Sequence, residues 1–159
     1  MGAVTYPNPE VDRFIAEHFV PVQYNVGEHP EAFQQFNAAW TPTIIIQDVE
    51  GREHRRSEGY LDPQRFLAEM SLALVKAALN RQEYEEAARR AEEAVGRTKG
   101  DKQREPEALY WKAVVAYRQT GSADPLLAGW NRLLDEYPDS EWAKRAEFIR
   151  QPKVEEKAA

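Results

Sequence analysis

Apolar residues at helical spacing predict an amphipathic helix near the start of the chain. Asn8 is a residue type that caps helices, and Pro9 follows it at the position where proline suits the first turn. The apolar residues that then recur three and four positions apart are Val11, Phe14, Ile15 and Phe19. One face of this helix is therefore expected to pack on a core.

The next segment alternates apolar and polar side chains, as a strand does. It covers residues 20–26, and Pro21 near its start suits a strand entrance or an edge strand. Gly27 ends the pattern. A short helix is predicted over 29–36, with Phe33 and Phe36 turned inward.

A hairpin is predicted after residue 43. Residues 44–49 include three consecutive isoleucines, which are stiff side chains typical of a strand buried on both faces. Glu50-Gly51 supplies a tight turn, and the more polar residues 52–60 are expected to return as an antiparallel strand.

From residue 63 onward the spacing of apolar residues is helical. Asp62-Pro63 caps a long helix that ends near residue 80. Further helices are predicted over 83–97, 105–120, 124–136 and 140–149. Residues 151–159 have mixed charge and little to bury, so we expect a frayed tail there.

Composition excludes several classes of function. The chain has 159 residues and a net charge of −6, which argues against nucleic-acid and anionic membrane partners. It has no cysteine, so it cannot supply a cysteine nucleophile, a thiolate metal ligand or a redox thiol. Its start lacks the pattern of a signal peptide, and no apolar run approaches the ~18 residues of a membrane span. A soluble cytoplasmic protein is therefore expected.

The element order up to residue 70 resembles the thioredoxin family. Trp40-Thr41-Pro42-Thr43 stands just before the isoleucine strand, Gly51 lies at the hairpin turn, and Gly59-Tyr60 precedes the capped helix. The resemblance covers about residues 4–70. It implies a cis peptide bond between Thr41 and Pro42, in a loop that presents its backbone to an extended substrate.

The chain also departs from that family. The family's first strand, its Cys-x-x-Cys motif and most of its first long helix would come before Val4. The resemblance therefore implies an empty strand position between 20–26 and 44–49. The two strands pair directly, or residues 1–6 fill the gap, or another chain fills it. Because an unfilled position leaves ladder groups unpaired, dimerisation through the gap is one hypothesis.

The helical half resembles tetratricopeptide repeats. Residues at the signature spacing are Tyr117, Gly121, Trp130, Leu133 and Pro138. A less complete earlier copy contains Leu74, Ala78, Tyr84, Ala87, Ala91 and Ala94. The implied fold class is an α/β thioredoxin-like half with an incomplete sheet of about three strands, followed by an all-α array of tetratricopeptide-like hairpins. The implied domains are 1–70 and 71–150.

The remaining polar residues give weak signals. His18, His29 and His54 lie on three separate elements and are expected on the surface. The segment that contains Arg52, Arg55 and Arg56 is expected to be a solvent-exposed edge strand, whose charges discourage pairing with another strand. An anion site is the alternative. No catalytic residue, metal ligand or cofactor site is predicted.

These patterns favour a non-catalytic protein that binds a protein or peptide partner. The candidate peptide-binding residues are Trp40, Thr41, Pro42, Tyr110 and Tyr117. A homodimer through the sheet gap is a further possibility. The alternative function is the rear portion of a redox-active thioredoxin-family disulfide oxidoreductase whose Cys-x-x-Cys segment is missing from this chain.

Overall fold

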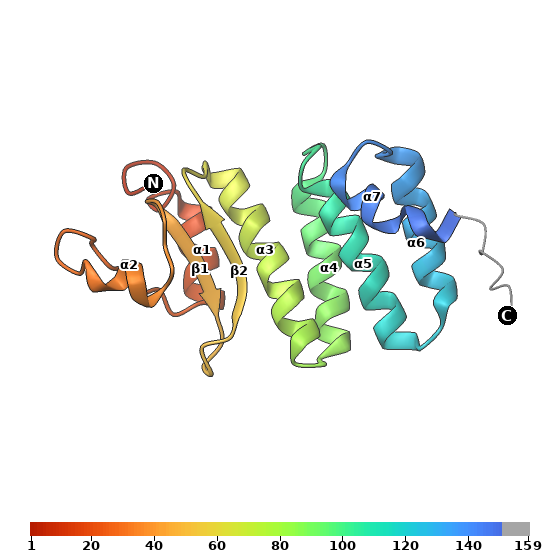
Figure 1. The fold of residues 1–159 in the computed structure, drawn as a ribbon, viewed down its shortest axis with the longest axis horizontal. Coiled ribbons are helices and arrows are strands. Elements are labelled where there is room, and N and C mark those ends of the chain that lie inside the picture. Colours follow the sequence, from red (N-terminus) through yellow and green to blue (C-terminus); the bar gives the residue numbers. More distant parts are fainter. Residues whose placement is uncertain (151–159) are drawn as a thin grey trace, which may run out of the picture.

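Side-chain caps begin four helices in the computed structural model of the protein, which describes residues 1–150 (Figure 1). Asn8 Oδ1 accepts hydrogen bonds from two backbone N–H groups of the first turn, and Asp62 Oδ1 accepts one. Ser122 and Ser140 cap two later helices in the same way. Each cap satisfies N–H groups that a first helical turn leaves unpaired. The prediction of a frayed tail at 151–159 lies outside the described residues.

The helices predicted from apolar spacing are all present, with some ends shifted by a few residues. The last of them is divided into a short α-helix and a 3₁₀ turn. In chain order the elements are α1 (Pro9–His18), α2 (Glu31–Gln35), β1 (Thr43–Gln47), β2 (Glu53–Glu58), α3 (Pro63–Asn80), α4 (Tyr84–Thr98), α5 (Glu105–Thr120), α6 (Ala123–Glu136), α7 (Glu141–Ala146) and η1 (Glu147–Arg150).

Within residues 1–150 the sheet has two strands, so the prediction of about three is wrong. β1 and β2 pair antiparallel, with a bulge between Ile46 and Gln47. Residues 20–26 do not form a strand, and the side chains of Val20 and Val22 are 92% and 71% exposed. The physical reason is that an extended segment becomes a strand only when a neighbour pairs its N–H and C=O groups.

The isoleucine strand is also less buried than its sequence predicts. All three isoleucines are only partly buried, and the strand ends at Gln47. Ile44 and Ile46 pack on a cluster formed by α1, α3 and the residue before Asp62. The members of this cluster are Val11, Phe14, Leu61, Phe66, Leu67 and Met70. The hairpin therefore has one face on the core, and Ile45 on the other face is only partly buried.

The helical half packs against α3, and α3 also packs against the first half. Leu72 and Val75 of α3 pack against alanines of α4 and against α5. Because alanine is small, α4 approaches its neighbours closely; its buried alanines are Ala87, Ala91 and Ala94. A third cluster joins α5, α6 and α7. Figure 1 shows α3 to α6 side by side, with the predicted boundary at residues 70 and 71 inside α3.

Candidate functional site

The predicted loop of Trp40, Thr41 and Pro42 lies directly before β1. The Thr41–Pro42 peptide bond is cis, as the family resemblance implies. Thr43 Oγ1 donates to the carbonyl oxygen of Trp40 at 2.6 Å, and Gly59 N–H donates to the carbonyl of Pro42 at 2.8 Å. The loop backbone is thus held at both ends, while the Trp40 side chain is 68% exposed.

The other two candidate residues lie on α5, in the helical half. Tyr110 is partly buried and stacks on Trp130, with ring centroids 4.8 Å apart. Tyr117 is 40% exposed near the end of α5. Since β1 and α5 belong to different halves (Figure 1), the five candidate residues form two surfaces and not one site.

A group of aromatic side chains joins α5 to α7, and we call it the aromatic row: Tyr110, Trp111 and Trp142. The Trp142 centroid lies 5.1 Å from the Tyr110 ring and 5.9 Å from the Trp111 ring. All three side chains are partly buried, so each keeps some area open to solvent. Of these three residues, only Tyr110 was predicted from the sequence as a binding residue.

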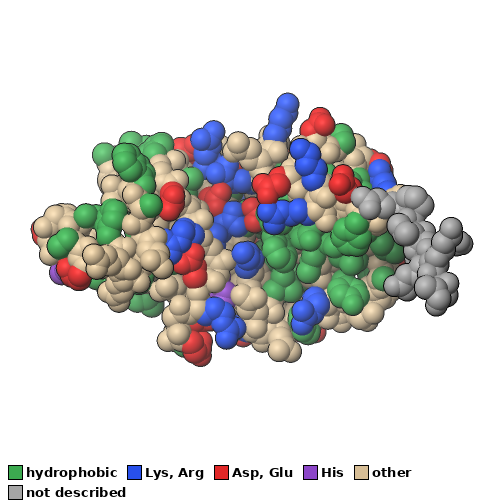
Figure 2. Space-filling model, in the orientation of Figure 1, with side chains coloured by type: hydrophobic (Ala, Val, Ile, Leu, Met, Phe, Trp, Pro, Cys, Tyr) green, Lys and Arg blue, Asp and Glu red, His purple; other side chains and the backbone are tan. Residues whose placement is uncertain are grey.

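Cations lie over two rings of the aromatic row. Lys76 Nζ of α3 is 5.7 Å from the Trp111 centroid, and the Arg145 guanidinium is 4.7 Å from the Trp142 centroid. Such cation–π contacts attract through the ring quadrupole. Figure 2 shows hydrophobic side chains gathered on one face of the helical half, with Lys and Arg side chains at the border.

Within the described residues, some cations of the helical half have a carboxylate partner and others do not. Arg145 pairs with Glu141. Arg118, near the end of α5, donates to the Tyr84 hydroxyl at 2.8 Å. Neither Lys76 nor Arg118 has a carboxylate partner within residues 1–150. The helical half therefore presents uncompensated positive charge next to aromatic surface, although the whole chain is acidic.

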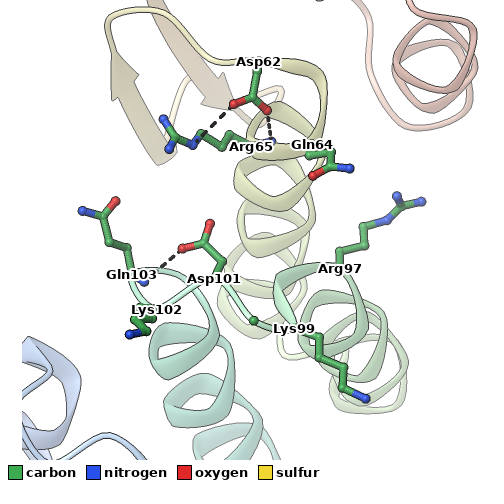
Figure 3. A pocket seen from close by; sticks show the side chains of 9 residues that line it. Asp62, Gln64, Arg65, Arg97, Lys99, Asp101, Lys102 and Gln103 are labelled. Carbon is green, nitrogen blue, oxygen red and sulfur yellow. Dashed lines mark hydrogen bonds and ion pairs between the residues drawn. The ribbon is translucent and has the colours of Figure 1, made fainter.

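A separate hollow lies between the start of α3 and the loop from α4 to α5 (Figure 3). It has a volume of about 630 Å³. Arg65 pairs with Asp62 at 3.4 Å, and Arg97 pairs with a carboxylate of α1 at 2.7 Å. Figure 3 shows the side chains of Arg97, Lys99 and Lys102 pointing in different directions. Because these cations do not converge on one point, the hollow is not a built anion site.

His54 is buried, so its predicted place on the surface is wrong. It is 3% exposed, with Nε2 at 3.1 Å from Asp48 Oδ2 and Nδ1 at 2.9 Å from Asn80 Nδ2. Asn80 donates to Nδ1 in this arrangement, which assigns the ring proton to Nε2. The bulge gives β2 an extra residue at this point, and a bulge redirects side chains. The imidazole therefore ties the hairpin turn to the end of α3.

Arg55 likewise is not the solvated residue that the sequence predicts. It donates to Glu69 at 2.5 Å and to Glu107 at 2.7 Å, while Arg104 donates to Glu69 at 2.6 Å. These side chains, which we call the buried ion network, are only 10% to 13% exposed. Burial opposes ionisation of Glu69, but hydrogen bonds and charge from the two arginines outweigh it and lower its pKa. The network joins β2, α3 and α5.

Arg56 also has partners, on the other face of the hairpin. Its guanidinium donates to Glu53 and to the carbonyl oxygen of Phe36, the latter at 2.8 Å. It thus holds the end of α2 against β2. The structure therefore does not leave Arg55 and Arg56 free to bind an anion.

The fold and these contacts can be compared with known proteins. Residues 2–74 match the family model of the thioredoxin-like domain. This similarity supports a thioredoxin-like fold for residues 2–74, which we call the thioredoxin-like domain. The match ends within α3, so it leaves the helices from α4 onward unassigned. No curated protein and no solved structure matches the chain.

Two kinds of reactive group are absent from the described residues. The chain contains no thiol. Among residues 1–150, no three His, Asp or Glu side chains are grouped so that they could hold a metal ion. In the same residues no helix combines the length and apolarity needed to cross a bilayer. What the described residues offer is a strand edge, an exposed loop and the aromatic row.

Proposed function

We propose that this protein is a non-catalytic interaction protein, with a thioredoxin-like domain and tetratricopeptide-like helices. In this proposal the helical half binds a segment of a protein partner across α3, α5 and α7. The observation that carries it is the aromatic row, with Lys76 and Arg145 over its rings.

The charge of this surface favours one class of segment. Lys76 and Arg118 have no carboxylate partner in the described residues, so a partner that brings Asp or Glu side chains gains ion pairs without breaking existing ones. Aromatic rings next to cations suit a partner with apolar side chains between its acidic ones. We therefore expect an acidic, partly apolar segment to bind best.

A peptide array tests this proposal. It carries acidic, neutral and basic peptides of matched length and apolar content, and the labelled protein is applied at several salt concentrations. We expect the acidic set to bind, with affinity falling as salt rises, because exposed charges are screened. The double variant Lys76→Glu with Arg118→Glu should bind the acidic set at least about tenfold more weakly, which corresponds to about 1.4 kcal/mol.

A charge-matched control uses two lysines that line the hollow. Lys99→Glu with Lys102→Glu changes the net charge by the same amount, and neither lysine lies over a ring of the aromatic row. This control should keep wild-type binding. Equal losses in both double variants would mean that bulk charge and not this surface holds the peptides. No binding above background for any peptide class would contradict the proposal altogether.

A second function is favoured by the match of residues 2–74 to the thioredoxin-like domain. We propose as the alternative that these residues are the rear portion of a disulfide oxidoreductase. Its Cys-x-x-Cys segment would be encoded upstream of Met1 or carried by another chain. An in-frame Cys-x-x-Cys in the DNA just before Met1 would support this alternative. The 159-residue chain alone should show no disulfide reduction in either case, because it has no cysteine.

A further inference from the structure

We propose that two copies of the chain associate through the free edge of β1, which pairs antiparallel with β1 of the second copy. This association uses the thioredoxin-like domain and does not depend on the proposed peptide surface of the helical half.

One edge of β1 has backbone groups without a strand partner in residues 1–150. Gly59 N–H donates to the carbonyl of Pro42, and Ile44 pairs with Ser57 two residues further along. Antiparallel ladders alternate, so the N–H and C=O groups of Thr43, Ile45 and Gln47 point away from β2. Another extended backbone pairs such a row of alternating donors and acceptors directly.

The two outer edges of the hairpin differ in charge. β1 has the sequence Thr-Ile-Ile-Ile-Gln and carries no charged side chain. β2 carries four charged residues, and its Arg55 is held by α3 and α5 in the buried ion network. Charged or covered edges resist the addition of another strand. Within residues 1–150 the β1 edge lacks both protections, which makes it the edge that accepts a partner.

A second copy fits this edge because the strand is self-complementary. With Ile45 on the two-fold axis, Ile45 of one copy faces Ile45 of the other, and both N–H groups and both C=O groups pair. Thr43 then faces Gln47 of the other copy, and Ile44 faces Ile46. No like charges meet, and β-branched side chains pair well across strands.

The association is closed. A two-fold axis uses the same edge on both copies, giving a four-stranded sheet with β2 at each outside edge. Figure 1 shows β2 on the α3 side of the hairpin, and α3 contacts β2. Further copies therefore cannot add at the outside, so the expected assembly is a dimer and not a fibre.

Exposed apolar side chains near β1 add area to this interface. Trp40 is joined to the start of β1 by the hydrogen bond from Thr43. Phe19, which precedes the exposed Val20, packs on the same cluster as Ile44. Valines and a tryptophan that are largely exposed in one copy cost free energy in water, so covering them stabilises the association.

The first experiment measures the mass of the full chain by light scattering during size exclusion, over a range of concentrations. We expect twice the chain mass of 18.3 kDa. The variant Ile45→Lys places a charge at the two-fold axis and should be a monomer. The control Val49→Lys adds the same charge on the fully exposed hairpin turn and should remain a dimer. Far-UV circular dichroism of both variants checks that they are folded.

The second experiment uses the absence of natural cysteine to locate the contact. In a directly opposed pair of this type the two Cα atoms lie about 5.5 Å apart, within the range that a disulfide spans. Ile45→Cys should therefore form a covalent dimer under mild oxidation, detected by non-reducing electrophoresis. Val49→Cys should show only the low level of cross-linking that random collision gives.

A monomeric wild-type chain at every concentration overturns the proposal. So does a dimer that persists in Ile45→Lys, or one in which Ile45→Cys cross-links no better than Val49→Cys. These outcomes leave the peptide-array result unaffected, since that experiment reports on the helical half.

Discussion

Glu69 of α3 receives side-chain hydrogen bonds from three residues. Its carboxylate accepts from Arg55, Arg104 and Ser57, in surroundings that leave its side chain 10% exposed. Removing one partner from a buried ion pair leaves an uncompensated charge, so Glu69→Gln should lower the free energy of unfolding by about 3 kcal/mol. Urea denaturation measures this change.

An exposed pair provides the control for this substitution. Glu136 pairs with Arg132 one helical turn away on α6, and both side chains are more than a third exposed. Because solvent screens such pairs, Glu136→Gln should change the free energy of unfolding by about 0.5 kcal/mol or less. Similar losses in the two variants would mean that the buried ion network does not add stability beyond an ordinary surface pair.

The same carboxylate predicts a pH dependence. Hydrogen bonds and charge from Arg55 and Arg104 outweigh the effect of burial and hold the pKa of Glu69 below its usual 4.5. The unfolded chain therefore binds a proton at Glu69 at higher pH than the folded chain does. Stability from this group is complete above pH 4.5 and is lost as the pH falls through the folded pKa. Urea titrations at a series of acidic pH values should show a shallower decline for Glu69→Gln than for the wild type.

His54 should contribute to stability and not to catalysis. His54→Ala removes both ring hydrogen bonds and leaves Asp48 and Asn80 without these partners, which should cost about 2 kcal/mol. His29 offers a matched control, since it is half exposed and its ring pairs with Glu31 and lies edge-on to Tyr24. His29→Ala should therefore change the free energy of unfolding by about 0.5 kcal/mol or less. Thermal or urea unfolding of the two variants gives the comparison, and equal effects would contradict the structural role of His54.

At the scale of elements, a close contact between α5 and α6 predicts the effect of a single methyl group. A Cβ added at Gly129 of α6 would lie 2.6 Å from the Cβ of Ala113 on α5. Gly129→Ala should therefore destabilise the protein by about 1–2 kcal/mol, although alanine is the better helix former. Gly96 lies within α4 with open space around its Cα, so Gly96→Ala should instead stabilise by about 0.5–1 kcal/mol.

A double variant separates the clash from other effects. Ala113→Gly removes the methyl group that Gly129→Ala would meet, so the two substitutions together should cost less than their sum. Strict additivity in chemical denaturation would mean that α5 and α6 do not approach as closely as Gly129 indicates.

The helices were predictable from the sequence because their evidence is local. Caps such as Asn8 and Asp62, and apolar residues three and four positions apart, depend on only a few neighbouring residues. The prediction of a strand at 20–26 was wrong because strand pairing depends on a second segment, which can be distant in the sequence. Alternation in that segment shows which side chains could share a face, but it cannot supply the neighbour whose backbone completes a ladder.

The buried polar contacts were harder to predict for a related reason. The bulge between Ile46 and Gln47 shifts the register of β2, and the sequence alone gave no sign of it. One signal was present, however. Glu69 interrupts an apolar stripe of α3 between Phe66 and Met70, and a charge at a core position indicates a buried partner. The exposed loop at Trp40 was predicted because its motif, Thr41-Pro42 just before the isoleucines, can be read directly from the sequence.

At the scale of the whole molecule, α3 decides whether the two halves are independent. Met70 packs in the cluster of the thioredoxin-like domain, and Leu72, two positions later, packs in the cluster of the helical half. The buried ion network adds a second link, since Arg55 of β2 reaches Glu107 of α5. Neither half keeps its core if α3 unfolds, so we expect both halves to unfold together.

This expectation is tested with one optical probe in each half. A dye on Val49→Cys, at the fully exposed hairpin turn, reports on the thioredoxin-like domain. Intrinsic fluorescence reports mainly on the helical half, which holds Trp111, Trp130 and Trp142. The two urea midpoints should coincide, and Leu72→Ala should lower both together by removing about 3 kcal/mol of core packing. A dye transition that precedes the tryptophan transition would show that the hairpin and α1 separate from α3 before the helices do.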